Sequence, residues 1–141
     1  MKKQILCYII LSGLLLSCQQ DDPPPSVTPN NVSSTVSSGT WRITYYYDSD
    51  HEETSSFTGY NLTFNSSGSV VAVKNTSEVS GTWATGTDDS QVKLIFAFPA
   101  GTEFTELSDD WHVLERSDTR IGLRDISGGN GGTDYLTLEK N

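Results

Sequence analysis

Apolar and aromatic residues alternate with polar ones along most of the chain after Gly39. The alternation is clearest at 41–47, 60–64 and 92–98, where every second side chain is apolar or aromatic. A period of two is typical of strands that bury one face and expose the other. Five further segments rich in β-branched and aromatic residues complete a set of about eight strands: 69–75, 78–84, 111–116, 120–126 and 135–139. The chain is therefore predicted to be all-β.

The connections between these segments are short and rich in turn-forming residues. They lie at 65–68, 74–77, 86–89 and 117–119, and only residues 104–107 are expected to make a helical turn. Short antiparallel strands joined by hairpins expose sheet edges unless the sheet closes on itself. We therefore expect an antiparallel up-and-down barrel of about eight strands, with a β-sandwich as the alternative.

The N-terminus has the pattern of a secretory signal. Lys2 and Lys3 precede an apolar run that ends at Leu16 and is too short to span a bilayer. The sequence Leu-Leu-Ser-Cys ending at Cys18 resembles the lipobox of bacterial lipoproteins. The resemblance implies that residues 1–17 are removed as a signal peptide, that Cys18 is acylated with chains such as palmitate, and that the protein is anchored to the outer membrane.

Residues 18–38 are expected to form a lipidated flexible tether, because they are rich in proline, serine and threonine and contain few apolar side chains. The run Gln-Gln-Asp-Asp after Cys18 resembles the acidic signal that sends lipoproteins of one large group of Gram-negative bacteria to the cell surface. A tether that faces the periplasm is the alternative. The folded domain is then expected to span residues 39–141.

Charge and cysteine content exclude several classes of function. The chain has 18 acidic and 9 basic residues, so nucleic acid is not an expected partner. Cys7 lies in the signal and Cys18 is expected to carry lipid, which leaves no thiol for a disulfide or a metal. We expect a monomer that has no cofactor and no metal site.

Catalytic signatures are weak, and we expect a protein that is not an enzyme. The histidines, His51 and His112, have no recognisable triad context. The acidic loop at 48–52 could supply oxygen ligands to a hard cation, but it lacks the pattern of an EF-hand and is interpreted as a solvated hairpin. The glycine-rich segment 127–132 is interpreted as a loop at the mouth of the barrel.

The triplet Gly39-Thr40-Trp41 resembles the G-x-W motif that opens the first strand of lipocalins. The resemblance covers residues 39–141 and implies that Trp41 packs across the closed end of the barrel. It also implies that an arginine from a late strand, Arg120 or Arg124, lies over the indole. Together with the lipobox, the motif makes the chain similar to small lipocalin-like lipoproteins of bacteria.

That resemblance implies binding of a small hydrophobic molecule inside the barrel. The alternation directs one set of apolar and aromatic side chains toward the expected pocket: Tyr45, Tyr60, Leu62, Phe64, Leu94 and Phe96. The opposite face, which includes Arg42 and Lys93, is expected to meet water. The alternative function is a surface interaction or adhesion module, and it is favoured if bulky side chains fill the interior.

Overall fold

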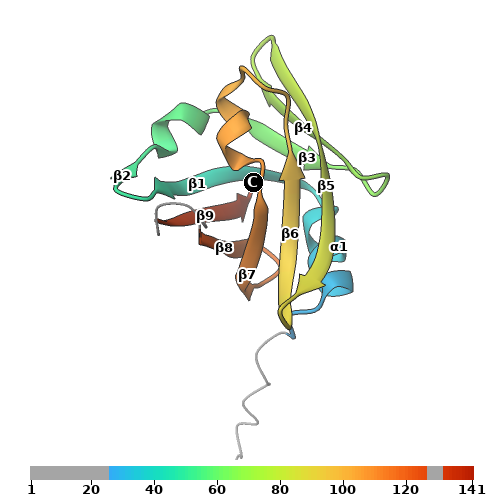
Figure 1. Cartoon of the computed structure of the whole chain (residues 1–141). Coiled ribbons are helices and arrows are strands. Elements are labelled where there is room, and N and C mark those ends of the chain that lie inside the picture. The colour runs from blue at the N-terminus through green and yellow to red at the C-terminus, as the bar shows by residue number, and fades with distance from the viewer. Residues whose placement is uncertain (1–25, 127–131) are drawn as a thin grey trace, which may run out of the picture.

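The structure is a computed structural model that describes residues 26–126 and 132–141 (Figure 1). The signal segment, Cys18 and the glycine-rich segment 127–131 lie outside these residues. The elements are α1 (Pro29–Val36), β1 (Thr40–Asp48), β2 (His51–Glu52), η1 (Thr54–Phe57), β3 (Asn61–Phe64), β4 (Ser69–Lys74), β5 (Ser77–Asp88), β6 (Gln91–Ala97), η2 (Glu103–Leu107), β7 (Asp110–Arg116), β8 (Arg120–Ile126) and β9 (Thr133–Lys140).

The strands form a closed antiparallel barrel. Each of β3 to β9 pairs with its neighbour along the chain, β3 pairs with β1, and β1 also pairs with β9, which closes the sheet. Eight strands build the barrel, and the two-residue β2 pairs only with the end of β1. The predicted up-and-down barrel is therefore confirmed, and the sandwich alternative is wrong. The expected helical turn at 104–107 is present as η2.

The alternation along β1 is broken by a bulge, and this corrects one predicted pocket residue. Ile43 pairs with Leu138 but Tyr45 pairs with Thr137, so Thr44 is an extra residue in the ladder. A bulge reverses the facing of every residue that follows it. Tyr46, rather than Tyr45, therefore points into the barrel, and Tyr45 lies on the outer wall with 39% of its surface exposed.

A helix of eight residues, α1, lies within the segment 18–38 that was expected to be a flexible tether. Thr28 caps α1 through its hydroxyl, which accepts a hydrogen bond from the Asn31 amide, and Pro29 occupies the first turn, where proline is tolerated. Val32 and Val36 are completely buried. The packed part of the chain therefore begins before Gly39, within the segment expected to be the tether.

The helix α1 lies across one end of the barrel. The indole N–H of Trp41, at the start of β1, donates to the Val36 carbonyl at 2.9 Å. Trp41 is completely buried, and the Lys140 ammonium lies 5.2 Å from the centre of its ring. A late-strand cation does cover the tryptophan, but it is this lysine from β9 rather than Arg120 or Arg124.

Aromatic side chains fill the interior of the barrel. Neighbouring rings have centroids 5.0–6.4 Å apart along one continuous series: Trp83, Phe64, Phe96, Phe98, Phe104, Phe57, Tyr46 and Trp111. The indole N–H of Trp111 donates to the Leu107 carbonyl in η2, and that of Trp83 donates to the Asn65 carbonyl. Packing of this kind, with both of these indole N–H groups hydrogen-bonded, stabilises a solid core. Among the described residues, no helix is long and apolar enough to cross a membrane.

Candidate functional site

Buried side chains pack against one another where the sequence predicted an internal pocket. Five of the six predicted lining residues point inward and are at most 6% exposed: Tyr60, Leu62, Phe64, Leu94 and Phe96. The ring of Tyr60 packs against that of Phe104, and the rings of Phe64 and Phe96 pack against each other. The hydroxyl of Tyr60 donates to the Glu103 carboxylate in η2. This hydrogen bond raises the pKa of Tyr60 and lowers that of Glu103. These side chains form the core, and the sixth, Tyr45, lies outside it.

An apolar groove, here called the outer groove, opens instead on the outer wall of the barrel with a volume of about 330 Å³. One row of paired residues crosses four adjacent strands beneath it, from Glu115 through Gly122 and Thr137 to Tyr45. Tyr135 on β9 and Leu114 on β7 complete its sides. Because Gly122 has no side chain, the floor of the groove stays low at that strand.

Two β-bulges set the walls of the outer groove. The bulge in β1 turns Tyr45 outward, as described above. A second bulge leaves Leu114 without a partner in β8, because Val113 pairs with Leu123 and Glu115 pairs with Gly122. Leu114 is consequently 48% exposed. Bulges are frequent beside functional sites because they redirect side chains, and here both of them deliver an apolar side chain to the same groove.

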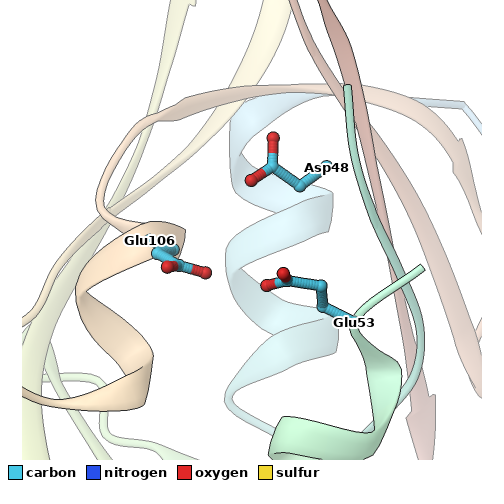
Figure 2. A group of neighbouring side chains, drawn as sticks. All are labelled: Asp48, Glu53 and Glu106. Carbon is cyan, nitrogen blue, oxygen red and sulfur yellow. The ribbon is translucent and has the colours of Figure 1, made fainter. Parts of the chain in front are cut away.

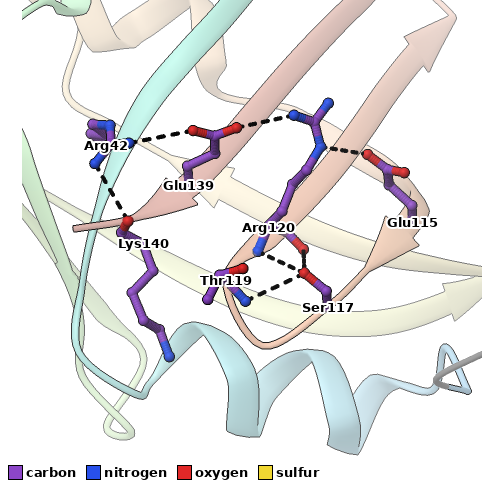
Figure 3. Close-up of polar contacts among 7 residues, drawn as sticks. All are labelled: Arg42, Glu115, Ser117, Thr119, Arg120, Glu139 and Lys140. Atoms are coloured by element: carbon purple, nitrogen blue, oxygen red, sulfur yellow. Dashed lines mark hydrogen bonds and ion pairs between the residues drawn. The ribbon is translucent and has the colours of Figure 1, made fainter.

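A network of charged side chains borders the groove at its Arg120 end (Figure 3). The Nε–H of Arg120 donates to Glu115 at 2.7 Å, and its Nη1 donates to Glu139 at 3.0 Å. Glu139 also accepts from Arg42 at 3.4 Å. The hydrogen bond that Arg120 donates to Glu115 is the main cause that raises the pKa of Arg120. The network fixes a carboxylate and a guanidinium next to apolar walls, which suits a ligand that has one polar end.

Within the described residues, two groups of carboxylates could each hold a cation. Asp48, Glu53 and Glu106 place one oxygen each within 4.8 Å of one another (Figure 2), and Asp109, Asp110 and Asp125 do the same. Partial desolvation, followed by the negative charge of Glu53, raises the pKa of Glu106. Acidic groups of this kind are common on proteins without an ion. The two groups in this protein also include residues outside the loop at 48–52, which was the candidate cation site in the sequence.

The two histidines lie on different strands. His51, on β2, bonds through Nδ1 to Asp50 and through Nε2 to Glu53 at 2.6 Å, and these hydrogen bonds raise its pKa. His112, on β7, is half-buried, and its Nδ1 has no hydrogen-bond partner within residues 26–126 and 132–141. Neither histidine belongs to the outer groove.

Sequence reasoning assigned no residue to an outer groove: Tyr45 was placed inside the barrel, and outward residues were assigned to solvent. One signal was available in Gly122, since an isolated glycine inside a strand indicates a bulge or a close approach. Both occur: the bulge is at Leu114, and a Cβ at Gly122 would lie 2.8 Å from the Cγ of Glu115. The positions of the bulges themselves carry no such signal in the sequence.

Comparison with known proteins supports the fold. Neither the protein-family models nor the curated proteins gave a match. Among solved structures, a DUF4847 family protein from Bacteroides vulgatus is 19% identical with a TM-score of 0.51, over 78% of this chain and 97% of that one. A protein from Burkholderia xenovorans, solved by NMR, is 13% identical with a TM-score of 0.44, over 86% of this chain and 96% of that one. The first likeness shows a shared barrel fold.

Proposed function

We propose that this protein is a lipid-anchored, non-enzymatic binding module that acts through the outer wall of a solid barrel. The lipobox ending at Cys18 supports an anchor in the outer membrane, and the acidic run after it supports display at the cell surface. The outer groove between β7, β8, β9 and β1 is the binding site in this proposal. The proposed ligand is still a small hydrophobic molecule, but it binds on the outside of the barrel and not inside it.

The packed interior is the observation that carries the proposal. A small barrel of about eight strands can either fill its interior with side chains or hold one ligand. Here the continuous series of ring contacts joins side chains from β1, β3, β5, β6, β7, η1 and η2, so a ligand inside would have to displace buried aromatic rings. Displacing such rings costs several kcal/mol, on the order of 3–5 for each truncated side chain. The outer groove offers apolar surface without that cost.

The chemistry of the groove defines the class of ligand. Tyr45, Leu114 and Tyr135 present apolar and aromatic surface, and Glu115 with Arg120 present an acceptor and a donor at one end. A volume of about 330 Å³ lies at the lower limit of small-molecule sites, which measure roughly 300–1,000 Å³. A small apolar ring or short chain with one hydrogen-bonding end fits these features.

A dye titration tests the site. The mature chain with Cys18→Ser, which lacks the lipid, is titrated with Nile red, an uncharged apolar dye, and fluorescence is followed to saturation. We expect saturable binding that weakens by about tenfold in Tyr135→Ala, since about 1.5–3 kcal/mol accompanies the burial of an apolar side chain. Ile95→Ala is the matched control, because Ile95 is a similarly exposed apolar residue outside the groove. Equal loss in both variants would exclude the groove.

The anchor is tested separately. Cells that express the full chain are labelled with a fatty-acid analogue, and the label is expected on the wild type and absent from Cys18→Ala. A Cys7→Ala variant is the control, because Cys7 lies in the segment expected to be removed. Labelling of the Cys18→Ala protein would overturn the anchor assignment.

A further inference from the structure

A second opening, here called the α1 pocket, lies between α1 and the ends of β7 and β9, with a volume of about 370 Å³. Its lining is polar, unlike that of the outer groove: Asn31, Ser34, Thr35, Ser38, Arg116, Asp118 and Lys140. Two of these residues are cations, and four carry hydroxyl or amide groups. In a chain whose net charge is −9, this local excess of cations and hydrogen-bond donors needs an explanation.

Arg116 is the central residue of the α1 pocket. The bulge at Leu114 shifts the register so that Arg116 pairs with Ile121, which is completely buried, and the arginine side chain is only 12% exposed. Its Nη1 donates to the Thr35 hydroxyl at 2.6 Å, and its Nε is buried without a hydrogen-bond partner among the described residues. A guanidinium carries several N–H donors, and a buried charge is costly unless it is paired.

The nearest carboxylate does not neutralise Arg116. Asp118 lies 3.9 Å from Nη1, which is longer than a hydrogen bond, and its side chain is 97% exposed. An ion pair with such an exposed partner is weak. The mostly buried guanidinium therefore has one neutral hydroxyl as its only close partner in the part of the chain that the structure describes.

Lys140 supplies the second positive charge. Its side chain extends from the end of β9 toward α1 (Figure 3), where Nζ lies 3.5 Å from the Ser38 hydroxyl and faces the ring of Trp41. The carbonyls at this end of α1 would repel an anion, but those of Ser33 and Thr35 accept from backbone amides, and that of Val36 accepts from the indole of Trp41. The negative end of the helix is thus largely satisfied.

We propose that the α1 pocket binds a phosphate group, either free or as the headgroup of a lipid. A phosphate carries up to two negative charges and several acceptor oxygens, which matches two cations surrounded by hydroxyl donors. A carboxylate would be satisfied by Arg116 alone and would leave Lys140 and the serine hydroxyls unused. The proposal is independent of the outer groove, since the two sites share no lining residue.

Titration with inorganic phosphate tests the proposal. The mature chain with Cys18→Ser is followed by NMR at the Nε–H of Arg116, with sodium chloride of equal ionic strength as the control. We expect a saturable shift with phosphate only, and at least about tenfold weaker binding in Arg116→Gln and Lys140→Gln, because hydrogen bonds to charged groups contribute about 1.5–3 kcal/mol. In Arg116→Gln the backbone amide of Thr35 replaces the lost reporter.

Matched variants separate binding from stability. Lys74→Gln is the control for Lys140→Gln, because Lys74 also places its ammonium over an aromatic ring, that of Tyr60 at 5.3 Å, but lies outside the pocket. Lys140→Arg should retain binding. Asp118→Asn should bind phosphate about two- to fivefold more tightly, since it removes an exposed negative charge that repels the anion. No saturable shift, or equal weakening in the Lys74→Gln and Lys140→Gln variants, would overturn the proposal.

Vesicles identify the source of the phosphate. If the unlipidated chain binds vesicles that contain phosphatidic acid more than vesicles of phosphatidylcholine alone, and loses this preference in Lys140→Gln, the ligand is a lipid headgroup. Binding of inorganic phosphate without that preference supports a free phosphate ligand. A vesicle preference that persists in Lys140→Gln, together with no saturable phosphate shift, contradicts both forms.

Discussion

Replacement of Trp41 tests how α1 is joined to the barrel. Trp41 is completely buried, and its indole N–H donates to the Val36 carbonyl at 2.9 Å. Trp41→Ala removes the ring and is expected to lower the free energy of unfolding by about 3–5 kcal/mol, as for other buried aromatic residues. Trp41→Phe keeps most of the apolar contact but leaves a buried carbonyl unpaired, so a smaller loss of about 1–3 kcal/mol is expected.

Denaturant unfolding measures both losses, and hydrogen exchange locates them. Because the lost hydrogen bond ends at Val36, Trp41→Phe should increase the exchange of α1 amides more than that of β4 and β5 amides. Tyr45→Ala on the outer wall is the control and should cost less than about 1 kcal/mol. A loss below about 1 kcal/mol for Trp41→Ala, or unchanged exchange in α1 for Trp41→Phe, would refute this account of the closed end.

Three further substitutions probe other parts of the molecule. Gly122→Ala brings a Cβ to 2.8 Å from the Cγ of Glu115, an exposed and movable side chain, so Nile red titration should show weaker binding while denaturant unfolding changes by less than about 1 kcal/mol. Asp110→Ala removes the carboxylate that lies 3.1 Å from the buried Nζ of Lys93 and should cost about 1.5–3 kcal/mol in denaturant unfolding. The pKa of Glu106 is raised by partial desolvation and by the charge of Glu53. The stability that its protonated form contributes is therefore complete below pH 4.5 and is lost as pH rises through the higher folded pKa. Glu106→Gln should therefore exceed the wild type in thermal stability at neutral pH and lose that advantage near pH 4.5, and an advantage that is the same at both pH values would contradict this cause.

The barrel could be predicted from the sequence because most strands alternate and most connections are short turns. The register of the paired strands could not be predicted, because a bulge adds one residue to a strand without changing its composition. That single residue in β1 moved Tyr45 from the interior to the wall. Lys93 was expected to meet water, and the alternation does place it on the outer face. Only the pairing of the strands reveals that Asp110 lies beside Lys93, which is 6% exposed.

The helix α1 was missed because its composition is that of a linker. Only two of its residues, Val32 and Val36, are strongly apolar and fully buried, and they are four positions apart, which places them on one helical face. Thr28 followed by Pro29 is a recognisable helix start, yet such a short helix depends on packing against the barrel for its stability. Local sequence alone does not contain that contact.

Methyl NMR on the unlipidated mature chain tests the central claim, that the interior is solid and that apolar ligands bind outside it. Leu114 lies in the outer groove, whereas Leu62 and Leu94 lie in the core, so their methyl groups report separately on the two locations. With saturating Nile red, the Leu114 methyl signals are expected to shift and to show contacts with the dye, while those of Leu62 and Leu94 stay unchanged. Direct contacts between the dye and the Leu62 or Leu94 methyl groups would contradict the account and restore the internal pocket.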